Sequence, residues 1–317
     1  MLFLDSDYVR RHLTYPVCIP AMRDAMIAFS AGETQQLLRS ILHLGAGRMF
    51  GVMPGGMEGK KVFGAKLVSI FPENFALGKP SHQGVIVLFE SDGGAPVCIV
   101  DAATVTAIRT ASASAAATDA LARPGTSSLA LLGYGEQAYT HAVALSEVRD
   151  IEAIRVWGRS RPRAEALAER LRKRLGANVM AAPDAEAAVK DADIICTLTA
   201  AAEPILNGAW VAPGAHVNVV GSSHAGPVEI DNDLVARSRF IVDSRASVLE
   251  QGAEFLRAKA EGLIDDTHIA AEIGEVFAGA VEGRRSPEEI TIYKSLGHVA
   301  QDLAAAALLY DGYGRRP

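Results

Sequence analysis

The segment Ser127–Ala138, with the sequence SSLALLGYGEQA, decides the fold of this 317-residue chain. Its apolar run SLALL leads directly into GYGEQA, a G-x-G-x-x-A fingerprint placed between a strand and a helix. In this motif the first glycine makes the turn, the second lets the backbone reach a pyrophosphate, and Ala138 permits close contact between helix and strand. N–H groups at the helix start then form an anion site. The motif predicts a dinucleotide site at Gly133 and Gly135; the alternative is a tight glycine turn without a ligand.

From residue 127 onward, apolar strands alternate with helices. Strands buried on both faces and separated by helices of about 10–15 residues are typical of a parallel sheet. The sequence therefore predicts an α/β fold with a Rossmann-type, doubly wound parallel sheet. We expect a long helix over 291–314, with no strand after it. The expected strands are SLALL (128–132), IEAIRVWG (151–158), DADIICTLT (191–199), HVNVVGSS (216–223) and RSRFIVD (237–243).

Residues 1–101 have a different texture, with short apolar runs between turns such as PGGMEG (54–59) and SDGGAP (91–96). This spacing predicts a meander of largely antiparallel strands. An Ala-rich helix is expected over 102–122, because the segment has strong helix formers and no internal Gly or Pro. The expected strands are LRSILHL (38–44), RMFGVMP (48–54), VFGAKLVSIF (62–71), GVIVLFE (84–90) and PVCIVD (96–101).

The composition is that of an ordinary globular protein, with 49% hydrophobic and 21% charged residues and a formal net charge of −6. Because no basic patch is present, nucleic acid is not an expected partner. Cys18, Cys98 and Cys196 are far apart, with no CxxC pair, so we expect buried thiols, a reducing compartment and no metal. The N-terminus lacks the apolar core of a signal peptide, and no membrane span is expected. Cytoplasmic localisation is the default expectation.

The end of the second expected strand bears on the choice of cofactor. An acidic residue there would accept a hydrogen bond from the ribose 2′-hydroxyl of NAD. The segment VWGRSRPR (156–163) has no acid, but it has Arg159, Arg161 and Arg163. Guanidinium groups suit a phosphate, so the sequence predicts NADP(H), with NAD(H) as the second choice. The alternative interpretation of these arginines is a solvated basic helix start.

Cationic residues also recur in the first hundred positions, where a strand or helix would usually be apolar. Lys66 lies within the apolar strand VFGAKLVSIF, Arg39 near the start of LRSILHL, and Arg109 among small residues in TAIRTASAS. Ser81 and His82 precede another apolar strand. Each could be a surface charge on its own. Together they favour an anionic, carboxylate-bearing substrate beside a nicotinamide.

Ten segments in characteristic order and spacing cover nearly the whole chain. They are GVMP (51–54), GAKLVSIF (64–71), PSHQG (80–84), AIRTASASAAAT (107–118), LLGYGEQA (131–138), VWGRS (156–160), AEPILNG (202–208), PGAHVNVVGSS (213–223), VDS (242–244) and YKSLGHVAQD (293–302). In these the sequence resembles the ornithine cyclodeaminase/mu-crystallin family, and especially its ketimine-reductase-like branch. The resemblance implies a homodimer with a dinucleotide-binding domain (121–290). It also implies a second α+β domain for substrate binding and dimerisation, built from both chain ends (1–120 and 291–317).

The resemblance also assigns site residues. Lys66 matches the active-site lysine, which exchanges a proton with the substrate or holds its carboxylate, and Arg39 and Arg109 match the arginines that clamp the carboxylate. His82 is a candidate general acid, with a cofactor-orienting role as the alternative. The positions expected at the cofactor are Ser81, His82, Arg109, Gly133, Tyr134, Gly135, Glu136, Gln137, Gly158, Arg159, Ser160, Arg163, Thr199, Val220 and Ser295.

Two departures from the family pattern bear on the reaction. Ser223 stands where ornithine cyclodeaminases carry an aspartate, and Gly51 or Val52 stands where they carry a glutamate. His224 is either a substitute for the missing aspartate or a polar loop residue. Cyclisation with ammonia loss needs a positioned amine and a base. The absence of both carboxylates therefore counts against a cyclodeaminase.

The remaining features are a carboxylate clamp, a proton donor and a nicotinamide site. They predict an NAD(P)H-dependent oxidoreductase that reduces an α-imino acid. Its substrate would be a cyclic ketimine of the Δ1-pyrroline-2-carboxylate type, or a 2-oxo acid with an amine. The alternatives are an ornithine or lysine cyclodeaminase, and a catalytically silent, crystallin-like protein that binds the cofactor.

Overall fold

The computed structural model describes residues 1–75, 77 and 81–314. Contacts divide the chain into two compact units, one formed by residues 1–110 and 298–317 and the other by residues 111–297. The sequence-based boundaries were 120/121 and 290/291, so the two divisions differ by about one half of a helix and one strand. Helix α3 (Ala102–Leu121) begins in the first unit and ends in the second.

The first unit is a mixed sheet in which strands follow the order β1-β7-β6-β5-β4-β2, with β3 also paired to β4. Neighbours from β3 to β7 are antiparallel, as the sequence predicts, whereas β1 runs parallel to β7. The strands are β1 (Leu2–Leu4), β2 (Thr34–Gln36), β3 (Ser40–Gly45), β4 (Arg48–Met57), β5 (Val62–Ile70), β6 (His82–Glu90) and β7 (Pro96–Asp101). The helical elements are α1 (Ser6–His12), α2 (Tyr15–Ser30), η1 (Glu58–Lys60), η2 (Pro72–Phe75) and α11 (Val299–Gly314).

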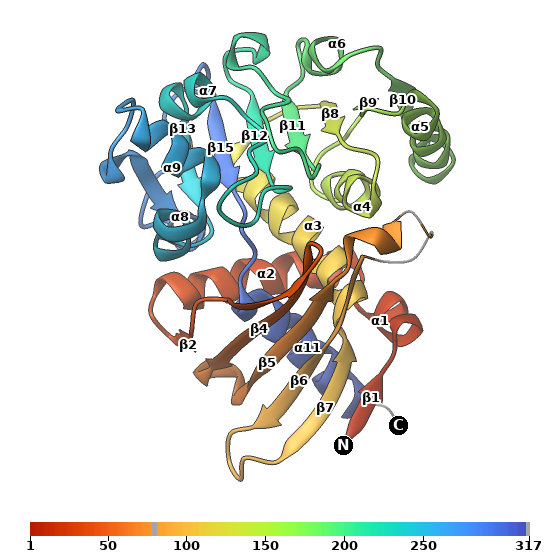
Figure 1. The fold of residues 1–317 in the computed structure, drawn as a ribbon, viewed down its shortest axis with the longest axis vertical. Coiled ribbons are helices and arrows are strands. Elements are labelled where there is room, and N and C mark those ends of the chain that lie inside the picture. Colours follow the sequence, from red (N-terminus) through yellow and green to blue (C-terminus); the bar gives the residue numbers. More distant parts are fainter. Residues whose placement is uncertain (76, 78–80, 315–317) are drawn as a thin grey trace. The chain divides into compact units, whose positions relative to one another are not determined.

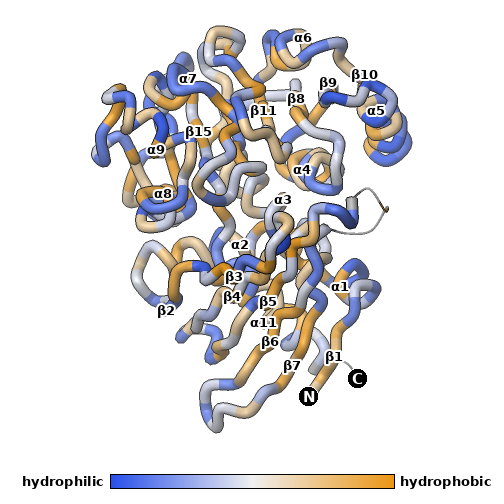
Figure 2. The backbone as a smooth tube through the Cα atoms, in the orientation of Figure 1, coloured by the Kyte–Doolittle hydropathy of each residue, from blue (hydrophilic) through white to orange (hydrophobic). Residues whose placement is uncertain are grey.

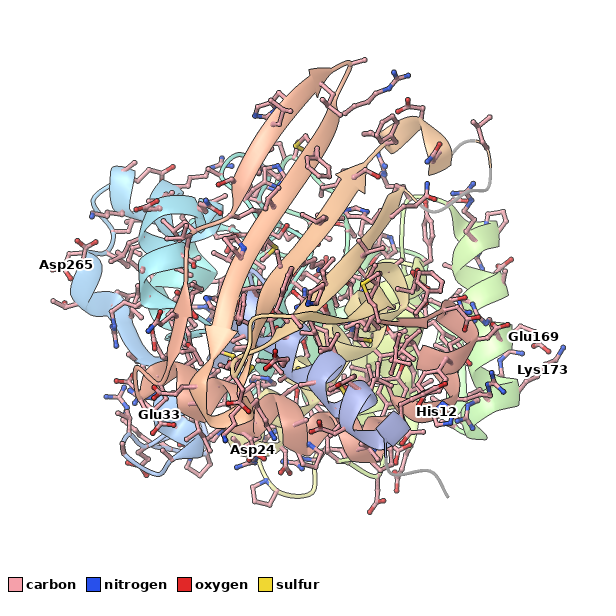
Figure 3. All side chains as sticks on the ribbon, turned by 90° about the horizontal axis from the view of Figure 1, so that it is seen from below. His12, Asp24, Glu33, Glu169, Lys173 and Asp265 are labelled. Atoms are coloured by element: carbon pink, nitrogen blue, oxygen red, sulfur yellow. The ribbon has the colours of Figure 1, made fainter. Side chains whose placement is uncertain are left out.

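Helix α11 packs against β4, β5 and β6 and against α2, so that one face of this sheet is covered (Figure 1 and Figure 3). Residues alternate along β5, and Val62, Gly64 and Lys66 are the buried ones in its first half. The turn expected at PGGMEG is wrong, because β4 continues through Pro54 to Met57 opposite β5. A Cβ at Gly55 would lie 2.8 Å from Val299 Cγ1, so glycine there permits the close approach of α11.

The second unit is a parallel sheet in the order β10-β9-β8-β11-β12-β15-β13-β14. Its first strands reproduce the 3-2-1-4-5 order of a Rossmann sheet, which confirms the predicted fold class. The strands are β8 (Ser128–Leu132), β9 (Ala153–Trp157), β10 (Asn178–Ala181), β11 (Ile194–Thr197), β12 (His216–Val219), β13 (Arg239–Val242), β14 (Ile269–Glu272) and β15 (Thr291–Lys294). The helical elements are α4 (Glu136–Leu145), α5 (Arg161–Leu175), α6 (Ala185–Val189), η3 (Gly208–Trp210), α7 (Asn232–Arg237), α8 (Arg245–Gln251), α9 (Ala253–Ala260), η4 (Asp266–His268) and α10 (Ile273–Phe277).

Figure 1 shows α5 next to β10 at one end of this sheet and α7 to α9 around β13 towards the other. Apolar residues of β8, β11, β12, β13 and β15 form the centre of the core. Leu167 and Leu171 of α5 are buried, whereas the charged residues of this helix are exposed. Figure 2 shows apolar residues in orange and charged residues in blue along α5. The labelled Glu169 and Lys173 project outward from α5 in Figure 3.

The expected helix over 291–314 is wrong in its first part. Thr291–Lys294 form β15, which pairs with β12 and β13, and α11 begins only at Val299. The run TIYK is rich in β-formers, and Gly297 has φ +80°, a conformation that interrupts a helix. The parallel sheet thus extends past the boundary expected at residue 290.

Candidate functional site

The fingerprint turn connects β8 to α4 in the second unit. Gly133 has φ +135°, and a Cβ there would lie 2.6 Å from the carbonyl oxygen of Leu198 on the neighbouring chain segment. At Gly135, which is the N-cap of α4, a Cβ would meet nothing within 4 Å, and no side chain caps the helix. The first glycine therefore serves the packing of the turn, whereas open space lies over the second. Uncapped N–H groups beside open space fit a pyrophosphate.

The end of β9 adds a second group of predicted residues. A Cβ at Gly158 would overlap the Tyr134 ring, so glycine lets this ring pack over the backbone. The Arg163 guanidinium lies 5.9 Å from the centre of the same ring. Arg159 is exposed, and Ser160 is the half-buried N-cap of α5. Arg163 therefore lies near the Tyr134 ring, whereas Arg161 pairs with Glu165 on the helix surface.

Thr199, Val220 and Ser295 follow β11, β12 and β15, so the carboxyl ends of adjacent parallel strands bring them to one edge of the sheet. Thr199 donates from both its hydroxyl and its backbone N–H to Glu229 Oε1, at 2.7 Å each. Gly221 N–H donates to Glu229 Oε2. Among the described residues the buried Ser295 hydroxyl has no hydrogen-bond partner. The Ser295 hydroxyl is therefore a polar group suited to a ligand.

A buried lysine that sequence reasoning missed supports this edge. Lys294 Nζ lies 2.7 Å from Glu254 Oε2, and it donates to both the carbonyl and the hydroxyl oxygen of Ser222 at 2.6 Å. The Ser222 hydroxyl also bonds Glu254 Oε1. We call Ser222, Glu254 and Lys294 the loop anchor, because they hold the loop that follows β12. The sequence assigned Lys294 to a helix, so only the structure shows it as a lysine at the end of a buried strand, a setting similar to that of Lys66.

The first unit brings together the predicted Lys66 and Arg109 around a carboxylate. Lys66 Nζ donates to Asp302 Oδ1 at 3.1 Å, and Arg109 Nε donates to the same oxygen at 2.9 Å. Arg109 Nη1 also donates to Gln301 Oε1 at 2.8 Å. Lys66, Arg109 and Asp302 are all buried. We call Lys66, Arg109 and Asp302 the charge cluster. Asp302 and Gln301 were not assigned, although a charge within an apolar helix gave the same kind of signal as Lys66.

The ionisation of the charge cluster follows from its surroundings. Burial lowers the pKa of Lys66 to about 8, against an opposing effect of Asp302, while Arg109 and Arg39 lower it further. Arg109 and Lys66 hold the pKa of Asp302 below its usual value in spite of its burial. Two cations therefore face one carboxylate, with Arg39 as a third cation whose charge reaches Lys66. This excess of positive charge suits the carboxylate of a substrate.

Two histidines lie near these cations. Desolvation, Lys66 and Arg39 lower the pKa of His82, although part of its side chain is exposed. Ser81 Oγ lies 3.0 Å from His82 Nδ1, whereas Pro80 of the same motif is outside the described residues. Burial lowers the pKa of His298 to about 4. Both imidazoles are therefore neutral near pH 7, which argues against His82 as a donor in its charged form.

The family description "Ornithine cyclodeaminase/mu-crystallin family" matches residues 2–315. The chain belongs to the ornithine cyclodeaminase/mu-crystallin family. Ketimine reductase mu-crystallin of Mus musculus is 36% identical over 316 residues, covering 98% of this chain and 97% of the relative. A Delta(1)-pyrroline-2-carboxylate reductase of Bacillus cereus is 32% identical over 313 residues, covering 98% and 96%.

A solved structure of this family has a closely similar fold. It is the Delta(1)-pyrroline-2-carboxylate reductase of Thermococcus litoralis in complex with NADH and L-proline, with a TM-score of 0.96 and 32% identity over 99% of this chain and 98% of that one. The family resemblance and the fold class expected from the sequence are confirmed.

The described residues lack two further features. No group of three or more His, Cys, Asp or Glu side chains is arranged to hold a metal ion. No helix there is long and apolar enough to cross a membrane.

Proposed function

We propose that this family member reduces a cyclic α-imino acid of the Δ1-pyrroline-2-carboxylate type to the cyclic amino acid, with NAD(P)H. The observation that carries the proposal is the buried charge cluster, which combines a proton-bearing amine with cations in excess over carboxylates. Full-length likeness to ketimine and Delta(1)-pyrroline-2-carboxylate reductases supports the same reaction. A reductive amination of a 2-oxo acid uses the same groups and is the variant to test beside it.

The substrate carboxylate is assigned to Arg109 and Arg39. Arg109 has Nε on Asp302 and Nη1 on Gln301, which fixes the plane of the guanidinium and leaves Nη2 as its third donor nitrogen. A guanidinium held in this way is already oriented before the substrate arrives, so little side-chain entropy is lost on binding.

The proton is assigned to Lys66. Because its pKa is about 8, most of the amine is protonated at pH 7. The pKa is also close enough to neutral pH for the ammonium to give up its proton readily. Lys66 gives this proton to the imine nitrogen and takes another from solvent after the reaction. When bound, the nicotinamide cofactor supplies the hydride that reduces the C=N carbon.

The second unit is assigned to the cofactor, with the turn at Gly133 and Gly135 on the pyrophosphate and Ser295 and Val220 toward the nicotinamide. Arg159 and Arg163, without an acid beside them, favour a ribose 2′-phosphate and hence NADP(H). The solved relatives include complexes with NADH and with NAD+, so NAD(H) is the competitor to measure.

The departures from the cyclodeaminase pattern support reduction over cyclisation. Ser223 and His224 are half-buried residues of the loop after β12, and Ser222 beside them is taken up by the loop anchor. Gly51 lies two residues from Met53, the partner of Lys66 across β4 and β5. Its ideal Cβ would lie 3.2 Å from Val68 Cγ1, so a carboxylate side chain at this position would crowd Val68.

A homodimer is the proposed assembly, and the sheet of the first unit supports it. Residues that alternate with Lys66 along β5 point to the opposite face of this sheet, and they include the apolar Phe63, Ala65 and Leu67. The rings of Phe63 and Phe89 stack there with their centroids 5.2 Å apart. The exposed fraction is 41% for Phe63 and 60% for Leu42. An antiparallel sheet with a solvated face would alternate apolar with polar residues. Light scattering should report a dimer, and Phe63→Lys should shift it toward a monomer.

One assay tests the reaction. The oxidation of NADPH and NADH is followed with Δ1-pyrroline-2-carboxylate, Δ1-piperideine-2-carboxylate and 2-oxo acids with amines, and ammonia release from L-ornithine and L-lysine is measured in parallel. We expect one L-proline formed per NADPH oxidised. Ammonia and proline from ornithine without net cofactor oxidation would identify a cyclodeaminase instead. Tight cofactor binding without turnover of any substrate would favour the catalytically silent, cofactor-binding protein.

A further inference from the structure

The carboxylate of Asp302 joins two residues that come from different elements. Its Oδ1 accepts from Lys66 on β5 and from Arg109 on α3, and the side chain is fully buried on α11. We propose that Asp302 is the positioning residue of the reduction, which holds the proton donor and the carboxylate-binding arginine on one oxygen atom. The inference rests on the proposed function, in which Lys66 donates the proton.

The geometry around Arg109 supports this role. Gln301, next to Asp302 on α11, accepts from Arg109 Nη1, and its own Nε2 donates to Met26 Sδ on α2 at 3.3 Å. Two consecutive residues of one helix therefore hold two nitrogens of the guanidinium. Without the carboxylate, the Lys66 and Arg109 cations would repel each other in a site with little water. The negative charge of Asp302 is what allows both cations to remain there.

The charges around Lys66 point in the same direction. Burial, Arg109 and Arg39 lower the pKa of Lys66, and Asp302 is the group that raises it. His82 and His298 are neutral near pH 7 and add no charge. Removal of the Asp302 charge leaves only influences that deprotonate Lys66, so the ammonium form would be lost at a lower pH.

Two substitutions separate the charge of Asp302 from its position. Asp302→Asn keeps the shape but removes the charge, and Asp302→Glu keeps the charge but displaces it by a methylene. Asp311→Asn, an exposed change on the same helix, is the matched control. The titration of Lys66 is read from the Cε resonance of protein labelled with ¹³C-lysine, assigned by Lys66→Arg. The pH profile of kcat is measured on the same proteins.

We expect Asp302→Asn to move the Lys66 titration and the alkaline limb of kcat at least one pH unit lower, which lowers kcat about fivefold at pH 8 and about tenfold well above pH 8. In Asp302→Glu the Lys66 titration should stay near that of the unmodified protein, whereas kcat should fall because the carboxylate is displaced. Asp311→Asn should change neither the Lys66 titration nor kcat. An unshifted Lys66 titration in Asp302→Asn overturns the proposal. If Asp302→Asn does not fold, wild-type kcat in Asp302→Glu overturns it.

The titration needs neither substrate nor cofactor. An inactive parent protein with a shifted titration in Asp302→Asn would therefore contradict the proposed function alone. An active parent with an unshifted titration would contradict only the role of Asp302.

Discussion

Each unit of this protein contains a buried lysine beside a carboxylate, but the two lysines are bonded differently. In the loop anchor, Lys294 is fully buried and has three oxygen partners, from Glu254 and from both oxygens of Ser222. In the charge cluster, Lys66 has one partner among the described residues, an Asp302 oxygen that Arg109 also uses. An ammonium has three protons to donate. Lys294 therefore uses its full capacity within the fold, whereas Lys66 keeps protons for another acceptor.

This difference separates structure from chemistry. A saturated buried ion pair holds backbone in place, here the loop after β12, and its loss leaves an uncompensated charge. A lysine with an incomplete set of partners, surrounded by other cations, has a lowered pKa and is suited to proton transfer. Three predictions test this distinction and a fourth tests the cofactor preference, in order of decreasing effect.

The largest effect is expected from Lys66→Met. Removal of the proposed proton donor should lower kcat for Δ1-pyrroline-2-carboxylate about a thousandfold, within the range of general acid catalysis. Steady-state kinetics measure it, with binding of NADPH by fluorescence expected to be unchanged. Lys60→Met, an exposed change in the same unit, is the control. Full activity in Lys66→Met would remove this residue from the mechanism.

Lys294→Met should act on stability instead. It leaves Glu254 buried without its cation, and we expect a loss of about 3 kcal/mol in the free energy of unfolding. Denaturant titration measures this loss. Activity of the folded fraction should keep the alkaline limb of the parent protein, because Lys66 is unchanged. A stable Lys294→Met protein with a displaced pH profile would break the comparison.

The third prediction concerns pH. Lys66 must be protonated to act as the acid, and burial lowers its pKa to about 8. The kcat should therefore be nearly constant below pH 7 and fall about tenfold per unit well above pH 8. The measurement is kcat from pH 6 to 10 at saturating substrate and cofactor. A limb that falls toward acid pH instead would mean that the lysine acts in its neutral form.

The smallest effect is expected at the edge of the second unit. Replacement of both Arg159 and Arg163 by Ala removes two exposed cations near the Tyr134 turn. The ratio of kcat/KM for NADPH over NADH should fall about fivefold to tenfold, a loss of roughly 1 kcal/mol for exposed charge pairs. Arg174→Ala, at the far end of α5, is the control. Equal or better use of NADH by the parent protein contradicts the NADP(H) preference itself.

Sequence periodicity was sufficient for most of the fold because hydrophobic pattern and glycine position carry local information. The strand that leads into Gly133 and the antiparallel run around Lys66 follow directly from apolar runs and their turns. Periodicity was not sufficient at Pro54–Met57 or at Thr291–Lys294. In both segments the pairing with a neighbouring strand determines the strand conformation. Gly55 and Gly56 of β4 pair with β5, and Thr291–Lys294 pair with β12 and β13.

The residues of the candidate site also fall into those that the sequence indicated and those that only the structure showed. Lys66 was visible as a charge in an apolar strand, and Arg109 as a charge in a helix of small residues. Asp302 and Glu254 are far from their partners along the chain, since Lys66 and Asp302 are 236 residues apart. Pairing over such a distance depends on how helices pack on a sheet, and a single sequence gives no measure of it.

The sequence by itself determined the Rossmann-type fold class, the glycine turn and the presence of several cations among the first 110 residues, because these depend on local pattern and residue type. Only the tertiary structure decided which cations are bound to carboxylates. The ionisation of a buried amine depends on its desolvation and on charges within a few ångströms. For that physical reason, two lysines in similar apolar strands become an anchor in one unit and a proposed proton donor in the other.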